Sequence, residues 1–495
     1  MLTTFLIAIS SLAAPAASAP APKVLGTEPS RASSPSEGIR SRDVDASRTV
    51  ARETGGGQRD GFIRGLRGEI LGPDGAAADK TLGGTLDSGF SPPWSIRPYV
   101  LNTYEVTLTG LESGWEEKFL LAVPRRPASP APLLVVFHAW GGLHTELTDR
   151  TEFMDAIQRG WYVLCPLGAH QFNFAIEYAQ RNVEAALDWV TTYIDIDPDR
   201  IYGVGFSMGG GMATSYAARH LDPNHARFAA VINHTGTASI RDVYNESADT
   251  SMLEHELMFG GSPDEYPFAY ARASSIDLYP DGVVSGLNDL ARNLLHIPVM
   301  TFSVDRDPNT YLLEQCDSFY GHTLALGGSP TYTEVPGNKH RWTTLDVDDV
   351  LDYFEPIRYQ DPAFGVPCRV LVDRDANWFH FGVFQRLGDR FSYFRWTLDA
   401  TNNRVVLDQL SNVRMIDFHP VDLGLPHATQ PLEVMVNVAD GLGTLDVEVH
   451  GYSWRPAAVV RTGVPTADWT YDAARGVVIL HETVGVGYPR WTILP

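Results

Sequence analysis

A serine near the middle of the chain stands where it could act as a nucleophile. Residues 201–211 read Ile-Tyr-Gly-Val-Gly-Phe-Ser-Met-Gly-Gly-Gly and place Ser207 in a Gly-x-Ser-x-Gly pattern. Residues 200–206 predict a short buried strand, and residues 208–220 predict a helix. A strand that turns sharply into a helix needs glycines where the two backbones nearly touch, as Gly205 and Gly209 would. Such a turn would raise the serine hydroxyl above a sheet, where a base could reach it.

A histidine is expected beside this serine, because a hydroxyl is a poor nucleophile until a base removes its proton. In this arrangement the chain order is serine, then carboxylate, then histidine in a loop after the last strand. His340 fits, since residues 336–342 form a loop directly after the predicted strand 331–335. His322 is the nearest alternative, but residues 312–326 read as a helix. The pattern therefore favours His340 as the base.

A carboxylate must hold the histidine in the correct tautomer. Asp305 and Asp307 both follow the predicted strand 298–302, and the residue types alone leave both open. The spacing Asp305-x-Asp307-x-Asn309 also resembles the start of a calcium loop. The sixth and twelfth positions of that loop lack the required Gly and Glu, so no metal site is expected.

Backbone N–H groups must stabilise the oxyanion that forms when a serine attacks a carbonyl. The N–H of Met208, at the start of the helix after the serine, is one predicted donor. The second is expected from the loop after the strand 133–137, where residues 138–142 read His-Ala-Trp-Gly-Gly. The N–H of Trp140 is the candidate, because the glycines after it let the backbone turn toward the serine.

Helices and apolar strands alternate along residues 95–358. Residues 133–137 are apolar on both faces, as expected for a parallel strand covered by helices. Residues 99–108 and 117–123 predict an antiparallel pair instead. The other predicted elements are helices at 149–159, 182–193 and 345–354 and strands at 161–165, 228–233, 298–302 and 331–335. This alternation predicts an α/β domain with a mostly parallel central sheet.

Residues 236–297 interrupt that alternation with scattered aromatics and turn signals. They predict either a cap-like insertion over the carboxyl ends of the strands or a plain structural excursion. Residues 359–495 contain period-two runs separated by turns, which predict a separate C-terminal all-β domain of the sandwich type. The aromatic residues of this second domain are expected to form its hydrophobic core. A polymer-binding platform is the alternative interpretation.

The first residues predict export from the cytoplasm. Residues 1–19 form a short apolar run that ends in Ala-Ser-Ala, as a secretory signal peptide does, so the protein is expected to be secreted or periplasmic. Residues 20–94 are rich in Pro, Ser, Ala and Gly and predict a disordered linker. Cys165 lies in an apolar strand, which leaves Cys316 and Cys368 as the predicted disulfide pair.

The overall charge excludes some partners. The formal net charge is −22, with 44% hydrophobic and 20% charged residues. So acidic a surface repels nucleic acid and anionic membranes, and no basic patch is visible. The substrate is therefore expected to be a small molecule or a polymer that carries the reacting group, with no nucleic acid and no membrane as partner.

Residues 197–213 (DPDRIYGVGFSMGGGMA) and 135–142 (VVFHAWGG) resemble the secreted α/β-hydrolases of the polyhydroxybutyrate depolymerase and feruloyl esterase type. Prolyl-oligopeptidase-like hydrolases are similar but more distant. The resemblance covers about residues 98–357, including the PGNKH loop at 336–340. It implies an α/β-hydrolase fold, a carboxylic ester substrate and no cofactor.

The resemblance also implies which aspartate completes the triad. Counted from Pro298, the strand and turn pattern of that family places the carboxylate at Asp307. Pro308 follows it, and a residue before proline favours extended geometry, which suits a side chain projecting from a loop. The leading hypothesis is thus a secreted serine esterase with Ser207, Asp307 and His340 as its triad. A serine peptidase and a non-catalytic polymer-binding protein with a decayed hydrolase fold are the alternatives.

Overall fold

The computed structural model describes residues 82–84, 94–100, 102–146, 154–247, 249–279, 282–284, 289–440, 443–483 and 488–495. The predicted signal peptide at 1–19 and nearly all of the predicted linker at 20–94 lie outside these residues. None of the helices in the described ranges combines the length and the apolar character that a membrane span requires.

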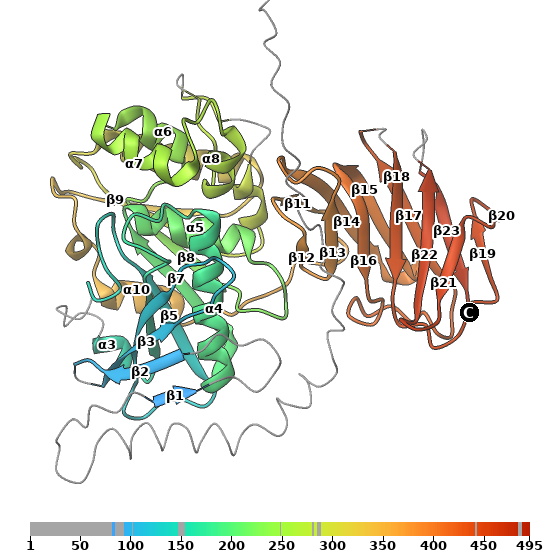
Figure 1. Ribbon diagram of the computed structural model, residues 1–495, viewed down its shortest axis with the longest axis horizontal. Helices are drawn as coiled ribbons and strands as arrows, with labels where there is room; N and C mark the ends of the chain where they lie inside the picture. Colours follow the sequence, from blue (N-terminus) through green and yellow to red (C-terminus); the bar gives the residue numbers. More distant parts are fainter. Residues whose placement is uncertain are drawn as a thin grey trace, which may run out of the picture. The chain divides into compact units, whose positions relative to one another are not determined.

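A ten-stranded sheet forms the first part of the fold (Figure 1). Its order in space is β1-β2-β3-β4-β6-β5-β7-β8-β9-β10. The strands are β1 (Leu82–Gly84), β2 (Trp94–Pro98), β3 (Thr103–Leu108), β4 (Glu117–Ala122), β5 (Ala131–Phe137), β6 (Tyr162–Pro166), β7 (Ile196–Phe206), β8 (Ala230–His234), β9 (Val299–Val304) and β10 (Thr331–Val335). The strands predicted from apolar runs are all present, and β7 begins a few residues earlier than expected. β1 lies inside the segment predicted as a linker and pairs with β2.

The sheet is parallel over its larger part. β6, β5, β7, β8, β9 and β10 pair in parallel, and β1 to β4 add an antiparallel edge that joins β6. Every residue of β5 and β6 is buried, as expected for strands covered on both faces. Because parallel strands end at the same edge, the loops after β5, β6, β7 and β9 gather there.

Helices connect these strands. They are α3 (Met154–Gln158), α4 (Glu177–Tyr193), α5 (Met208–Arg219), α9 (Thr310–Ala325) and α10 (Val347–Phe354). The segment between β8 and β9 contains α6 (Ile240–Glu246), α7 (Asp249–Phe259), α8 (Pro267–Ala273) and the 3₁₀ helix η2 (Leu290–Leu294). Figure 1 shows α6, α7 and α8 gathered as one helical group, all within residues 236–297, where the alternation of helices and strands was interrupted.

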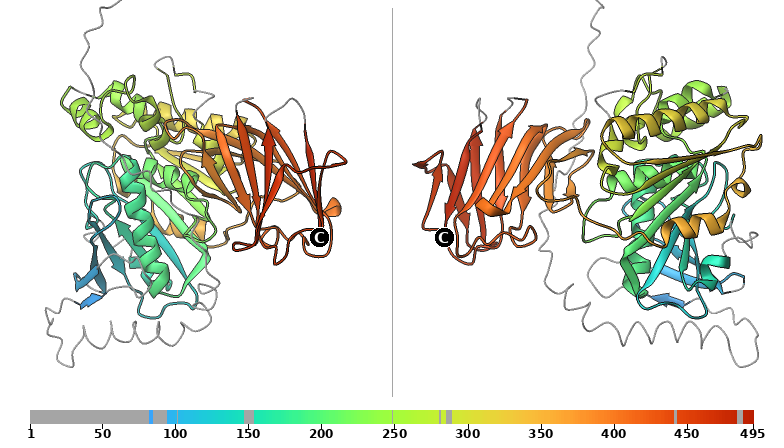
Figure 2. Two further views of the ribbon diagram at one scale, coloured as in Figure 1. Left: turned by 45° about the vertical axis from the view of Figure 1, so that its right-hand side comes forward. Right: turned by 180° about the vertical axis from the view of Figure 1, so that it is seen from behind.

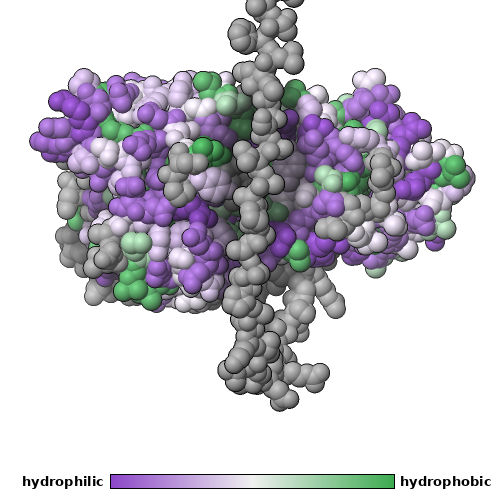
Figure 3. Space-filling model, turned by 90° about the horizontal axis from the view of Figure 1, so that it is seen from above, coloured by the Kyte–Doolittle hydropathy of each residue, from purple (hydrophilic) through white to green (hydrophobic). Residues whose placement is uncertain are grey.

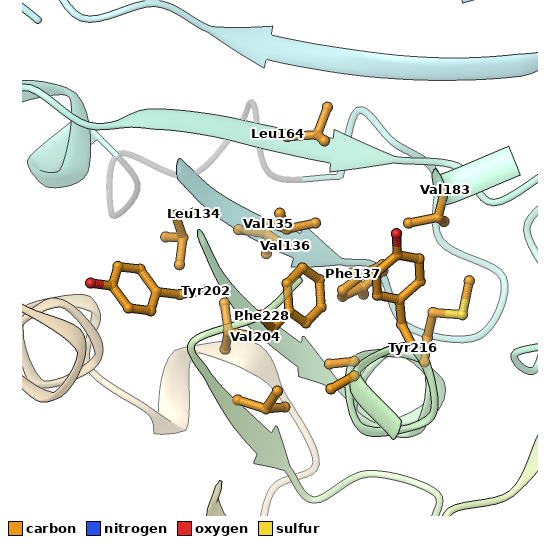
Figure 4. Packing of buried hydrophobic residues seen from close by; sticks show 14 of the residues in the cluster. Leu134, Val135, Val136, Phe137, Leu164, Val183, Tyr202, Val204, Tyr216 and Phe228 are labelled. Atoms are coloured by element: carbon orange, nitrogen blue, oxygen red, sulfur yellow. The ribbon is translucent and has the colours of Figure 1, made fainter. Parts of the chain in front are cut away.

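The core of this part lies on both faces of the sheet. Tyr202 of β7 stacks on Phe354 of α10, with ring centroids 4.8 Å apart. Tyr216 of α5 packs on Phe228 at 5.0 Å. Figure 4 shows Tyr202 and Tyr216 at opposite ends of the group of buried side chains that β5 and β7 contribute to. The helices thus bury the apolar residues from which the strands were predicted.

Two further sheets form the C-terminal part (Figure 2). One has the order β11-β14-β15-β17-β23-β19-β20 and the other β12-β13-β16-β18-β22-β21. The first comprises β11 (Cys368–Val372), β14 (Ser392–Asp399), β15 (Arg404–Ser411), β17 (Leu432–Val438), β19 (Ala458–Arg461), β20 (Val464–Pro465) and β23 (Arg490–Leu494). The second comprises β12 (Ala376–Trp378), β13 (Phe381–Gln385), β16 (Val413–Phe418), β18 (Thr444–Val449), β21 (Trp469–Asp472) and β22 (Val477–Thr483).

Both of these sheets contribute to one hydrophobic cluster that is distinct from that of the first sheet. Phe381 of β13 packs on Trp396 of β14, one from each sheet, at 5.5 Å. Trp378, Trp396 and Trp491 are fully buried, so these tryptophans form core. Trp454 remains exposed.

The predicted disulfide is wrong, because Cys316 and Cys368 are both free, as is Cys165. Cys316 is fully buried in α9, whereas Cys368 begins β11 and packs against the cluster of the C-terminal sheets. Each thiol therefore belongs to the packing of a different part of the fold. Burial raises the pKa of Cys316 and of Cys368 to about 12, which leaves both thiols protonated.

The coloured part of one face of the molecule is mostly hydrophilic. Figure 3 shows a face on which hydrophilic residues predominate and hydrophobic ones are scattered. Hydrophobic residues scattered singly in this way are common on protein surfaces.

Candidate active site

Ser207 lies at a strained turn between β7 and α5. Its φ and ψ are 56° and −123°, a conformation that a residue with a side chain rarely adopts. A Cβ added to Gly205 would lie 2.0 Å from the carbonyl oxygen of Gly209. The backbone of the helix therefore touches that of the strand, as the Gly-x-Ser-x-Gly pattern predicts, and only glycine fits.

Gly209 brings the helix against the end of β5. A Cβ at this position would lie 2.3 Å from the carbonyl oxygen of Phe137 and 2.6 Å from that of His138. The first turn of α5 is thereby placed beside the loop that follows β5. The two segments predicted to donate to an oxyanion are neighbours for this reason.

His340 is hydrogen bonded to Asp307. Its Nδ1 lies 2.8 Å from Asp307 Oδ2. The Asp307 side chain is 1% exposed and that of His340 is 19% exposed. The imidazole ring also packs on Phe206, the residue before Ser207, with ring centroids 4.4 Å apart. The structure thus gathers the predicted serine, histidine and aspartate at one edge of the sheet.

The hydrogen bond defines the chemistry of the histidine. A carboxylate accepts, so Nδ1 carries the proton and Nε2 keeps its lone pair. A histidine held in this tautomer can accept a proton at Nε2 while the buried carboxylate stabilises the resulting positive charge. Asp307 also accepts a hydrogen bond from the backbone N–H of Asn309, which fixes the carboxylate in turn.

Asp305 has a different position. Its carboxylate accepts a hydrogen bond of 2.7 Å from the N–H of Gly337, in the loop that leads to His340. The N–H of Asp305 donates to Val335, and that of Arg306 donates to Gly337. Asp305 therefore fastens the loop after β9 to the loop after β10. His322, the other histidine considered, lies on α9, 2.9 Å from Asp289.

The loop after β5 presents a backbone donor. The N–H groups of Ala139, Gly141 and Gly142 donate to Glu146, Gln171 and Ala139, respectively. Among the described residues, the N–H of Trp140 has no hydrogen-bond partner. Met208 begins α5, so its N–H is one of those that the helix itself cannot satisfy. Within the described ranges neither N–H group makes a hydrogen bond, and their role as oxyanion donors stays a prediction.

A buried glutamate that the sequence pattern did not single out holds the loop after β6, and that loop in turn contacts His138 in the loop after β5. Glu117 accepts hydrogen bonds of 2.8, 3.0 and 2.8 Å from the N–H groups of Leu167, Gly168 and Ala169. The carbonyl of Leu167 in turn meets His138 Nε2 at 2.9 Å. Burial raises the pKa of Glu117 to about 7, although the three N–H groups oppose that shift. The only signal in the sequence was a charged residue at the start of a buried strand.

One group elsewhere could hold a metal ion. Among the described residues, ligand atoms of Asp417, Glu448 and His450 lie within 4.8 Å of one another. Arg475 already pairs with Glu448 through two hydrogen bonds of 2.9 and 3.1 Å. The carboxylate charge is thus neutralised by an arginine, and the group is far along the chain from the residues at Ser207.

No family model matches the chain, and no curated protein matches it. Similar solved structures include a ferulic acid esterase, with 15% identity over 49% of this chain and 92% of that chain and a TM-score of 0.35. Another is an S-formylglutathione hydrolase from Agrobacterium tumefaciens, with 14% identity over 55% of this chain and 98% of that one and a TM-score of 0.37. An acylaminoacyl peptidase from Pyrococcus horikoshii has 16% identity over 59% and 52% and a TM-score of 0.39. At these identities and TM-scores the similarities carry no argument about function, so any proposal must be based on the geometry of the site.

Proposed function

We propose that this chain is a serine hydrolase of the α/β-hydrolase type that cleaves carboxylic esters through an acyl-enzyme intermediate. The observation that carries the proposal is the conformation of Ser207 at the end of β7, beside the hydrogen-bonded pair of His340 and Asp307. A strained serine at a strand–helix turn costs free energy that a merely structural residue would avoid. A nucleophile gains an exposed hydroxyl from the same strain.

The mechanism assigns one role to each group. Ser207 Oγ attacks the ester carbonyl while His340 Nε2 takes its proton, and Asp307 stabilises the imidazolium. The N–H groups of Met208 and Trp140 donate to the oxyanion of the tetrahedral intermediate. His340 then gives the proton to the departing alcohol, and the acyl group remains on Ser207. Water repeats the sequence as nucleophile and releases the acid. These steps use side chains and backbone alone, so the proposal requires no cofactor.

We further propose that the protein is exported and acts on an ester outside the cytoplasm. The support is the predicted signal peptide at residues 1–19, together with the resemblance of residues 98–357 to secreted depolymerases and feruloyl esterases. Amino-terminal sequencing of the protein recovered from the medium or periplasm tests this part. A chain recovered from the cytoplasm with residues 1–19 intact would contradict it.

One assay tests the reaction. Wild type and Ser207→Ala are compared on p-nitrophenyl acetate and butyrate, and each is treated with a fluorophosphonate probe. The expected result is turnover and covalent labelling of Ser207 in wild type and neither in the variant. Ser262→Ala changes a half-buried serine in the loop after α7 whose hydroxyl donates to Glu265; it serves as the matched control and should behave as wild type toward substrate and probe.

Two experimental outcomes would contradict the proposed esterase function and favour another one. Absence of both turnover and labelling in wild type favours a non-catalytic binding protein. Labelling of Ser207 with hydrolysis of peptide p-nitroanilides, and none of esters, favours a peptidase. The panel therefore includes peptide p-nitroanilides beside the esters.

A further inference from the structure

Asp417, Glu448 and His450 lie together on one face of a C-terminal sheet. β16 and β18 are parallel neighbours, and Asp417 stands directly opposite Glu448 in their register. Phe418 and Val449, the next residues of the two strands, are buried in the hydrophobic cluster. Because successive residues of a strand point to opposite faces, the two carboxylates lie on the face turned away from that cluster. His450 follows β18, and its N–H donates to the carbonyl of Phe418, which holds it beside the end of β16.

The three side chains approach one another at distances too long for a hydrogen bond. His450 Nε2 lies 4.0 Å from Asp417 Oδ2 and 3.8 Å from Glu448 Oε2. One ligand atom from each residue lies within 4.8 Å of the other two. His450 Nε2 is buried and has no hydrogen-bond partner among the described residues. A buried polar atom without a partner costs free energy, so a group that satisfies it is expected between these side chains.

Gly382 of β13 makes room for the carboxylate of Asp417. The two residues stand opposite each other in the register of β13 and β16, and the N–H of Gly382 donates to Asp417 Oδ1 at 3.2 Å. A Cβ on Gly382 would lie 2.3 Å from Oδ1 and 2.9 Å from Oδ2, so any other residue would displace the carboxylate. The glycine therefore lets the carboxylate of Asp417 lie close to the sheet, with Oδ2 toward His450.

The surroundings of this group carry more negative than positive charge. Arg475 donates to the two oxygens of Glu448 at 2.9 and 3.1 Å and to Asp472 at 2.7 Å. In the part of the chain that the structure describes, Asp417 pairs with no lysine or arginine, and its contact of this kind is with His450. Three carboxylates thus share one arginine. Each oxygen of Glu448 keeps a second lone pair, so the bonds to Arg475 orient this carboxylate and leave it able to bind a cation.

We propose that Asp417, Glu448 and His450 bind a divalent transition-metal ion, for which Zn²⁺ is the best fit. One imidazole nitrogen and two carboxylate oxygens suit Zn²⁺, whereas Ca²⁺ takes about six to eight oxygen ligands. Ligand atoms held at about 2.1 Å by a tetrahedral ion lie about 3.4 Å apart, so small side-chain movements from the present spacing complete the site. The ion joins β16 to the end of β18 and stabilises the C-terminal sheets. This role is independent of the proposed esterase function.

Calorimetry on the full chain tests the site directly. Protein without a histidine tag is freed of metal with EDTA, dialysed, and titrated with ZnCl₂ and, separately, with CaCl₂. Wild type should bind one Zn²⁺ per chain and bind Ca²⁺ far more weakly. Asp417→Asn and His450→Gln should each weaken zinc binding by more than about 100-fold, because loss of an outer-shell partner alone typically costs about 10–100-fold.

Two further variants separate this site from other histidines and from the ligands themselves. His481→Gln changes a histidine whose side chain is 43% exposed and which hydrogen bonds to Asp446 at 2.9 Å, and it should bind zinc as wild type does. Gly382→Ala alters no ligand but displaces the carboxylate of Asp417, so it should weaken zinc binding by at least about tenfold. Circular dichroism checks that each variant is folded.

Thermal unfolding and turnover complete the test. Zn²⁺ should raise the Tm of wild type, because it binds the folded chain, and EDTA should reverse that rise. EDTA should leave the hydrolysis of p-nitrophenyl butyrate unchanged, since the proposed triad uses no metal. Absence of zinc binding by wild type, or equal zinc binding by wild type, Asp417→Asn and His450→Gln, overturns the inference. Binding of Ca²⁺ in preference to Zn²⁺ overturns the assignment of the metal.

Discussion

Asp307 and His340 are 33 residues apart in the chain and meet in a hydrogen bond of 2.8 Å. The strands β9 and β10, which precede them, are parallel neighbours in register. Each residue follows the carboxyl end of its strand, so the pairing of the strands brings the two loops together. Asp305 then fastens those loops through Gly337. The two aspartates thus have different hydrogen-bond partners although they are two residues apart.

Replacing these aspartates one at a time should separate their roles. Asp307→Asn keeps the shape but can fix the wrong histidine tautomer, and we expect kcat to fall by about 10⁴, as in the serine-protease triad. Asp305→Asn weakens the hydrogen bond between the Asp305 side chain and the N–H of Gly337, in the loop that leads to His340, and should change kcat by far less. Steady-state hydrolysis of p-nitrophenyl butyrate measures both. The assignment is wrong if the larger loss belongs to Asp305→Asn.

Gly209→Ala should abolish activity, because the added methyl group would lie 2.3 Å from the carbonyl oxygen of Phe137. The helix would have to move away from β5 and from the loop with Trp140. Gly321→Ala on α9 is the matched control, since its Cβ would meet nothing within 4 Å. Replacing glycine with alanine inside a helix should stabilise the protein by about 0.5–1 kcal/mol. Esterase activity and thermal unfolding of both variants provide the measurement. An active Gly209→Ala enzyme would contradict the close approach.

Glu117 should make stability depend on pH. Burial raises its pKa to about 7 in the folded protein, from an ordinary value of 4.5. Between these values the folded state holds more protons than the unfolded state, so the free energy of unfolding falls as pH rises. The group contributes roughly 3 kcal/mol to this fall, and nothing more above its folded pKa.

Thermal unfolding of wild type and Glu117→Gln between pH 4.5 and 8 measures this effect. The stability of wild type relative to the variant should decrease toward pH 7 and then level. Glu334→Gln, which changes an exposed residue of β10, should show a constant difference from wild type. A difference that stays flat for Glu117→Gln as well would show that the carboxylate titrates near its ordinary value.

Asp373→Asn should destabilise the protein strongly. Arg219, the last residue of α5, and Asp373, which follows β11, both have side chains that are 0% exposed and form an ion pair of 2.5 Å. Burial opposes ionisation of Asp373, yet the charges of Arg219 and Arg272 hold its pKa well below the ordinary value. Removing the carboxylate leaves the buried Arg219 and the neighbouring Arg272 to share the carboxylate of Glu177, at a cost of about 3–5 kcal/mol.

Asp389→Asn is the matched control for that experiment. Asp389 is 78% exposed and lies 3.3 Å from Arg390, so its loss should cost about 0–1 kcal/mol. Denaturant unfolding followed by tryptophan fluorescence compares the two variants. Equal, small effects would mean that the buried ion pair does not contribute to the stability of the fold.

The sequence by itself determined the local features of this protein. Gly205, Ser207 and Gly209 could be assigned to the turn because the backbone of Gly205 contacts that of Gly209, only four residues later in the chain. Apolar runs such as residues 133–137 specified strands, and the loop of His340 could be placed because it follows the last of them. Alternation at period two gave the strands of the C-terminal sheets for the same local reason.

Only the tertiary structure decided which distant groups meet. It paired His340 with Asp307 and gave Asp305 to Gly337, because strand register sets which loop atoms approach. It left Cys316 and Cys368 as free thiols, since each is packed in a different part of the fold. It also revealed the buried Glu117 and the contacts of Asp417, whose partners come from other strands and loops. Burial and long-range hydrogen bonds depend on the whole chain, and no local pattern encodes them.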